Sequence, residues 1–206
     1  MAEEKIYLYP VWLRIWHGIN ALLIIFLIAT GISMQYANPE YPFIRFDLAV
    51  SIHNICGVLL AINYVIFLPS NLATSNRRYY VDGLKNIGPR MMRMMRYYLT
   101  EQPKKKPSPF PVTKENKFNP LQAMTYSIVM VIFLPLVITT GLALLFPETI
   151  AKEVFGYSGL FLTALLHSAI GFLISIFLIV HIYVCTTGKK ITDNFKGIIT
   201  GYHTNH

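Results

Sequence analysis

The chain has 206 residues, of which 54% are hydrophobic, and a formal net charge of +8 at pH 7. Its mean hydropathy of +0.46 and its apolar runs of about 20 residues exclude an ordinary water-soluble domain and predict a membrane protein. It has two cysteines and no Cys-x-x-Cys-His sequence, which excludes covalently attached c-type haem and leaves no cysteine cluster for an iron–sulfur centre.

Four apolar segments are long enough to cross a bilayer, at about residues 12–34, 48–69, 120–146 and 160–187. The N-terminus has no basic region followed by a small-residue cleavage site, so we interpret the first segment as a retained span and not a signal peptide. We therefore expect an all-α, four-helix membrane bundle that forms a single domain over residues 1–206.

The basic residues predict the orientation of these spans. Of the 18 Lys and Arg residues, only Arg45 and Lys152 fall in the connections 35–47 and 147–159. The positive-inside rule then places both termini and the long connection 70–119 in the cytoplasm. The net charge is explained in the same way, by orientation and contact with anionic lipid, and does not indicate nucleic-acid binding.

The long connection and the last two spans carry further local signals. Apolar residues recur at helical spacing between residues 84 and 98, with basic residues between them, which predicts a cytoplasmic amphipathic helix. We expect this helix to lie in the lipid interface, with docking of a partner as the alternative. Asn119 and Pro120 predict the start of span three, Pro135 predicts a kink in it, and Gly188 predicts the end of span four.

Four histidines lie within the spans: His17, His53, His167 and His181. The last two are 14 residues apart, so on one helix they point the same way to within about 40° and are separated by about 21 Å. By depth, His53 can face His167 near the outer leaflet, and His17 can face His181 near the inner leaflet. Two imidazoles on opposite sides of one iron give bis-His haem b, which suits electron transfer because no coordination position is open. The alternative for any one histidine is a hydrogen-bonded core residue, but four at paired depths favour two haems.

Small residues follow two of these histidines by one helical turn. Gly57 lies four residues after His53, and Gly171 lies four residues after His167. A missing side chain at this place would let a flat macrocycle lie against the helix backbone. Close packing of membrane helices through small residues is the alternative for each glycine, and the repetition favours haem.

Basic side chains near the inner surface are candidates for pairing with haem propionates. Arg14 precedes His17 by about one turn and is the first of them, although the positive-inside rule alone would also place an arginine there. Lys117 and Lys189 are weaker candidates of the same kind.

Taken together, these features resemble the four-helix, di-haem cytochrome b subunits of nickel–iron hydrogenases, formate dehydrogenases (the gamma subunit) and thiosulfate reductases. The resemblance covers nearly the whole chain. The motifs that carry it are Arg14-x-x-His17, His53-x3-Gly57, Tyr97-Tyr98-Leu99, Asn119-Pro120-Leu121-Gln122 and the histidine pair of span four.

The resemblance implies that the four histidines ligate two haem b groups in the pairs given above. It also implies a menaquinone or ubiquinone near the inner haem, which in this chain points to Asn119, with Gln122 nearby and His181 as the adjacent ligand. Both are polar side chains at the membrane edge, where a quinone carbonyl needs a hydrogen-bond donor. The alternative role of Asn119 is that of a simple N-cap.

In such complexes the subunit passes electrons between quinone and a redox partner in a bacterial or archaeal cytoplasmic (inner) membrane. We expect the partner to be an iron–sulfur, hydrogenase, molybdenum or multihaem cytochrome protein, on the periplasmic side. The chain is then an electron-transfer subunit and not a complete enzyme. The alternatives are a haem-free anchor for a catalytic subunit and a histidine-lined metal transporter, which the mostly aliphatic span centres disfavour.

Overall fold

A computed structural model of the chain describes residues 4–36, 38, 40–81, 84–104, 106–187 and 191–205. Four helical stretches, at 11–35, 46–73, 120–145 and 159–185, are long and apolar enough to cross a membrane. They confirm the predicted all-α fold with four spans. The cytoplasmic location of both termini stays a prediction, and Gly188 lies outside the described residues.

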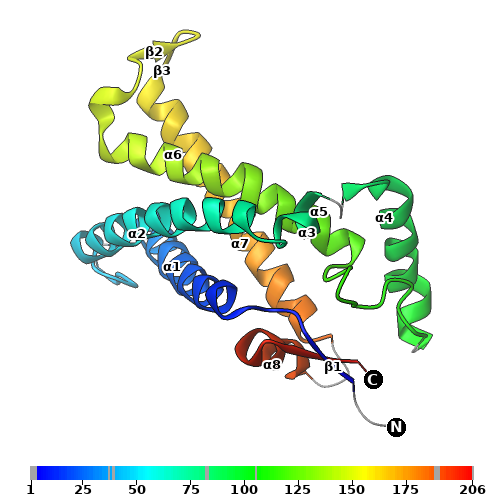
Figure 1. Cartoon of the computed structure of the whole chain (residues 1–206). Helices are drawn as coiled ribbons and strands as arrows, with labels where there is room; N and C mark the ends of the chain where they lie inside the picture. The colour runs from blue at the N-terminus through cyan, green and yellow to red at the C-terminus, as the bar shows by residue number, and fades with distance from the viewer. Residues whose placement is uncertain are drawn as a thin grey trace. The chain divides into compact units, whose positions relative to one another are not determined.

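The elements follow one another along the chain as labelled in Figure 1. In order they are β1 (Glu4–Tyr7), α1 (Val11–Gln35), α2 (Phe46–Ala73), α3 (Arg77–Val81), α4 (Ile87–Arg96), the π-helix η2 (Tyr97–Glu101), the 3-10 helix η3 (Gln102–Lys104), α5 (Pro120–Ile128), the π-helix η4 (Val129–Phe133), α6 (Leu134–Leu145), the 3-10 helix η5 (Pro147–Thr149), β2 (Glu153–Val154), β3 (Tyr157–Ser158), α7 (Gly159–Cys185), α8 (Asp193–Thr200) and β4 (Tyr202–Asn205).

The chain forms two compact units. Unit 1 comprises Met1–Arg14, Pro69–Ile132 and Cys185–His206, and unit 2 comprises Ile15–Leu68 and Phe133–Val184. Unit 2 therefore holds most of α1, α2 and α7 and all of α6, while unit 1 holds the long connection and both terminal segments. The assignment of residues 1–206 to a single domain stays a prediction.

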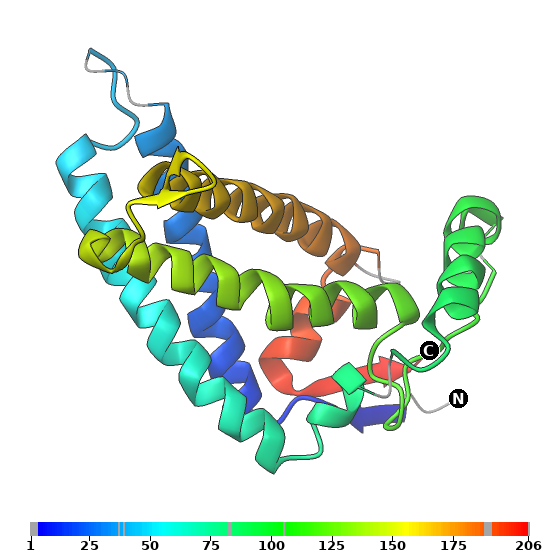
Figure 2. The same cartoon turned by 90° about the horizontal axis from the view of Figure 1, so that it is seen from above.

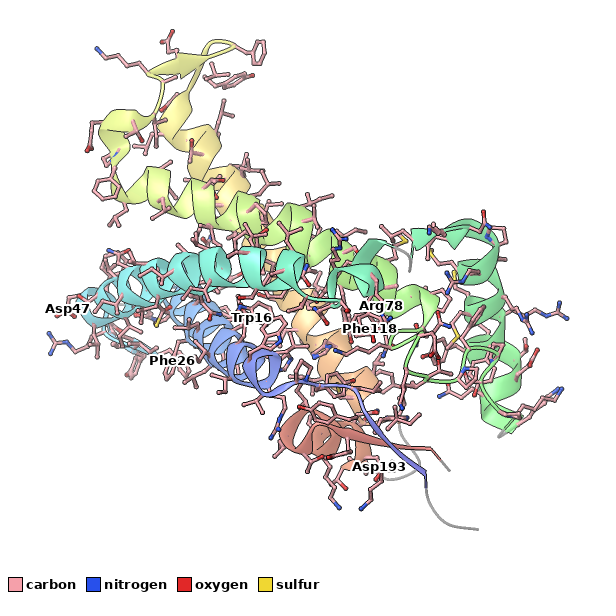
Figure 3. All side chains as sticks on the ribbon, in the orientation of Figure 1. Trp16, Phe26, Asp47, Arg78, Phe118 and Asp193 are labelled. Carbon is pink, nitrogen blue, oxygen red and sulfur yellow. The ribbon has the colours of Figure 1, made fainter. Side chains whose placement is uncertain are left out.

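Within unit 2, α1 lies beside α2 and α6 lies beside α7, as Figures 1 and 2 both show. Trp16 of α1, labelled in Figure 3, stacks on Phe67 of α2 with ring centroids 4.2 Å apart, and its Nε1 donates to the Asn63 carbonyl at 3.1 Å. Near the other end of α1, the Ser33 hydroxyl both donates to the Ile44 carbonyl and accepts from the Ile44 N–H, each at 3.0 Å. These bonds fix α1 against α2 and against the loop that joins them.

The third span changes its helical pattern halfway along. The π-helix η4 separates α5 from α6 and ends two residues before Pro135. Proline has no N–H and its ring crowds the preceding turn, so the backbone cannot continue an α-helical ladder through it and widens instead. The interruption lies where the sequence predicts a kink.

Unit 1 contains a pairing that the sequence analysis does not predict. Strands β1 and β4, at the two ends of the chain, pair antiparallel, with Tyr7 opposite Tyr202. The turn before β4 needs a glycine, because Gly201 has φ 92° and a Cβ there would lie 2.7 Å from Cε2 of Tyr7. In the same unit, α4 packs on α5 and confirms the predicted amphipathic helix, with Met94 buried and Met92 and Met95 exposed.

Candidate functional site

All four span histidines lie in unit 2, where they form two facing pairs. The rings of His53 on α2 and His167 on α7 have centroids 6.1 Å apart and an interplanar angle of 71°. The rings of His17 on α1 and His181 on α7 have centroids 6.3 Å apart and an angle of 52°. We call these the outer pair and the inner pair, after the depths that the sequence predicts. Helix α7 supplies one member of each.

The spacing of each pair fits one metal ion between two imidazoles. With metal–nitrogen bonds of about 2 Å on opposite sides of the ion, the two ring centres lie about 6 Å apart. No group of three or more His, Cys, Asp or Glu side chains suited to a metal occurs within the described part of the chain. A site with two protein ligands has too few ligands for a metal held by the protein alone. It suits a haem, whose macrocycle supplies four nitrogens of its own.

The glycines near these histidines differ in what surrounds them. A Cβ added to Gly57 or Gly171 would meet no atom within 4 Å, so the backbone is open one turn after His53 and after His167. This openness fits a flat group lying along the helices, although the role of these two glycines in haem binding stays a prediction.

Arg14 has a role in unit 1 that the sequence analysis did not anticipate. Its Nη2 donates to the carbonyl oxygen of Ile199 in the last turn of α8. A cation at the C-terminal end of a helix satisfies carbonyls that lack helical partners and interacts favourably with the helix dipole. The Nε of Arg14 is buried with no hydrogen-bond partner among the described residues. Pairing with a haem propionate stays a prediction.

Asn119 and Gln122 form a complete capping box at the start of α5. The Asn119 Oδ1 accepts from the Gln122 N–H at 2.9 Å, and the Gln122 Oε1 accepts from the Asn119 N–H at 3.1 Å. The Nδ2 of Asn119 also donates to the Tyr98 hydroxyl at 3.4 Å. The N-cap predicted for Asn119 is therefore confirmed, and its contact with a quinone stays a prediction.

Lys117 lies just before this cap, inside a group of aromatic rings in unit 1. Its side chain is only 3% exposed, and Nζ lies 4.2 Å from the ring centroid of Tyr9 and 5.4 Å from that of Tyr79. The third ring is that of Phe118, labelled in Figure 3, whose centroid lies 5.5 Å from Nζ of Lys117. Burial lowers the pKa of Lys117 to about 7. Lys189, the other weak candidate for a propionate, lies outside the described residues.

Comparison with known proteins gives the chain a family. Residues 8–201 match the family of prokaryotic cytochromes b561. The chain belongs to this family. Over 200 residues it is 34% identical to the Escherichia coli (strain K12) protein named "Putative cytochrome YdhU", an alignment that covers 97% of this chain and 75% of that protein. No solved structure matches the chain.

Membership in the cytochrome b561 family makes this chain a multi-pass membrane cytochrome and implies haem b and transmembrane electron transfer. It agrees with the resemblance to membrane-bound cytochrome b subunits that the sequence motifs indicate. The haem fits the two histidine pairs of the cytochrome, because their ring spacing leaves room for one metal ion in each. The number of haems and the identity of their ligands stay predictions.

Two residues of this cytochrome b561 lie beside the outer pair and were not among the predicted site residues. The hydroxyls of Thr30 on α1 and Thr140 on α6 lie within hydrogen-bond distance of the Nδ1 atoms of His53 and His167. A signal for them exists in the sequence. Thr-Gly occurs in spans one and three, and each time the next span carries His-x3-Gly.

Proposed function

We propose that this cytochrome carries electrons across the membrane through two haem b groups, one in each histidine pair. The observation that carries the proposal is the geometry of the pairs, whose ring centroids are 6.1 Å and 6.3 Å apart. The two α7 histidines are separated by about 21 Å of helix rise, so the two sites lie near opposite faces of a bilayer whose hydrocarbon core is about 30 Å thick.

In each site the two facing histidines would hold the iron of a haem. A haem held there would supply one-electron chemistry. With two imidazoles as its protein ligands, each site would favour electron transfer over the binding of oxygen or a substrate. The helices that carry the histidines are apolar along the spans, and such surroundings would influence the potential at which each haem is reduced.

The proposal extends to the two ends of this route. At the inner end, Asn119 and Gln122 supply amide groups at the start of the third span, where a menaquinone or ubiquinone carbonyl would accept a hydrogen bond and protons would come from the cytoplasm. Arg14 is the candidate partner for an inner haem propionate. At the outer end we propose a periplasmic redox subunit that exchanges electrons with the outer haem. Flow in either direction is compatible with this arrangement.

Single histidine substitutions test the proposal. We expect His53→Ala and His167→Ala to lose the same haem and to leave one per chain, whereas His17→Ala and His181→Ala lose the other. The measurement is the haem content of each purified variant together with the potential of the haem that remains. His203→Ala, in strand β4, is the matched control and keeps both haems.

The outcomes separate the alternatives. Retention of both haems in His53→Ala or His17→Ala would reject the pairing. Loss of haems with the same potential from His53→Ala and His17→Ala would reject the assignment of these residues to different sites. A colourless wild-type protein, with no haem after purification from cells that supply it, would favour the haem-free membrane anchor.

A further inference from the structure

Two threonines contact the outer histidines from helices that carry no outer ligand. The Oγ1 of Thr30 on α1 lies 2.9 Å from Nδ1 of His53, and the Oγ1 of Thr140 on α6 lies 3.0 Å from Nδ1 of His167. Both threonines are buried, with 1% and 8% of their surface exposed. Each outer imidazole is therefore contacted at its Nδ1 atom by one buried hydroxyl.

The hydrogen bonds of these hydroxyls determine which histidine nitrogen carries the proton. The Thr30 hydroxyl donates to the Phe26 carbonyl at 2.7 Å, and the Thr140 hydroxyl donates to the Leu136 carbonyl at 2.6 Å. A hydroxyl has one proton, and a carbonyl can only accept. With that proton donated to the carbonyl, each threonine oxygen is left as an acceptor, and this assigns the donor role to the Nδ1 that faces it.

Backbone carbonyls support the same assignment. Leu27 and Val137, each three residues before its threonine, also offer a carbonyl to His53 and His167, respectively. With the proton on Nδ1, the lone pair lies on Nε2. This is the tautomer in which Nε2 can bind a metal, and the hydrogen bonds of the threonines assign it to both outer histidines.

A glycine follows each threonine and lies against the same imidazole. A Cβ on Gly31 would be 3.6 Å from Cε1 of His53, and a Cβ on Gly141 would be 3.0 Å from Cε1 of His167. The hydroxyl thus contacts the ring at Nδ1, and the absence of a side chain on the glycine leaves space for the adjacent Cε1. The same Thr-Gly contact occurs in α1 and in α6, once for each outer histidine.

We propose that Thr30 and Thr140 are positioning residues for the outer haem, which fix the tautomer and ring orientation of its two ligands and lower its reduction potential. An acceptor on Nδ1–H makes the imidazole a stronger electron donor, and a stronger donor favours the oxidised iron. The inference rests on the proposed function, since it requires a haem in the outer pair. Nothing in it depends on the quinone or on the partner.

Removal of each hydroxyl at constant shape tests the inference. In Thr30→Val and Thr140→Val we expect the equilibrium constant for reduction of the outer haem to rise about tenfold, which is about 59 mV for one electron, with no change for the inner haem. Thr140→Ser keeps the hydroxyl and should restore the wild-type potential. Thr139→Val is the matched control, because Thr139 is exposed on the same helix and its hydroxyl donates to the Pro135 carbonyl.

The measurements are haem content and a potentiometric titration of the purified cytochrome. Loss of the outer haem from Thr140→Val, with retention in Thr140→Ser and Thr139→Val, would also support the inference, because only the hydroxyl differs. An unchanged outer potential in both valine variants at full haem content would overturn it. Loss of the outer haem from Thr140→Ser as well would overturn it in favour of simple packing.

The failure of this inference can be told apart from the failure of the proposed function. If the wild-type protein holds one haem or none, the proposed function fails before any threonine is changed. If the wild-type protein holds two haems and the valine variants behave as wild type, only the role of the threonines is rejected.

Discussion

Gly31 and Gly141 differ in how close an added Cβ would come to the imidazole ring that each one faces. A Cβ on Gly141 would lie 3.0 Å from the His167 ring, which is too close without a shift, whereas one on Gly31 would lie 3.6 Å from the His53 ring, an ordinary contact. The two positions share a sequence pattern, and only the structure separates them.

We therefore expect Gly141→Ala to weaken the outer haem site and Gly31→Ala to leave it nearly unchanged. Forcing an extra methyl group into a packed site costs about 1–3 kcal/mol. The measurement is the fraction of the outer haem retained during incubation in detergent, with the inner haem as the internal standard. Equal retention of the outer haem in the two variants would contradict the difference expected from the two Cβ distances.

Lys117 is a buried cation whose surroundings are aromatic rings. Because burial lowers its pKa to about 7, the folded protein releases this proton at a lower pH than the unfolded chain, in which a lysine pKa is about 10.4. Between these two values the unfolded state binds more protons, so this group makes the protein more stable as the pH rises. Its burial is most costly at and below pH 7.

Lys117→Met should consequently raise the free energy of unfolding at pH 6, on the order of 1–3 kcal/mol once the lost cation–π contacts are subtracted, and with it the thermal midpoint. The increase in the thermal midpoint should be smaller at pH 9. Thermal unfolding in detergent at the two pH values gives the comparison, and Lys114→Met, at an exposed position of the same segment, is the control. A gain that is the same at both pH values would show that Lys117 is not neutral in the folded protein at pH 9.

The start of α5 combines a structural role with a proposed binding role. Asn119 accepts through Oδ1 to cap the helix and donates through Nδ2 to Tyr98. Asn119→Ala removes both functions and should cost about 1 kcal/mol of stability. Asn119→Asp keeps an acceptor for the cap but has no amide donor, so the two roles can be separated.

We expect Asn119→Asp to be as stable as the wild type and to be reduced by quinol about tenfold more slowly, as the loss of one hydrogen bond of about 1.4 kcal/mol implies. Stopped-flow reduction of the haems by a quinol analogue measures this, and the thermal midpoint is the control. A wild-type rate in Asn119→Asp would leave Asn119 as a helix cap only.

The elements also show how far the sequence alone could be interpreted. The four spans are predictable because 20 or more apolar residues have one stable solution in a bilayer, a helix with all its backbone hydrogen bonds made internally. The pairing of β1 with β4 is not predictable in this way. Each strand has four residues, and their partners lie at opposite ends of the chain, so neither has a pattern of its own.

The depth of each histidine in its span predicted which histidines come together. The depth of each one follows from its position in its span, and imidazoles at different depths cannot share an iron. Depth could not predict Thr30 and Thr140, because their contacts depend on how each helix is rotated about its axis against its neighbour. That rotation is set by packing across the unit and leaves only the weak Thr-Gly repetition in the sequence.

The orientation of the molecule rests on charge. The two connections with few basic residues, 35–47 and 147–159, adjoin the ends of the spans nearest the outer pair. If they face the periplasm, an electron entering there passes first to the site of His53 and His167. In the proposed function the route would then end at the site of His17 and His181, on the cytoplasmic side where a quinone would take up protons.

The proposed function requires that one chain holds two haems, each between two histidines. The most direct measurement is the ratio of extractable haem b to polypeptide in the purified wild-type protein, with the oxidised spectrum as a check of low-spin, bis-histidine iron. We expect two haems per chain and no high-spin component. A ratio of one or zero, or a five-coordinate signal that binds an added ligand, would contradict it.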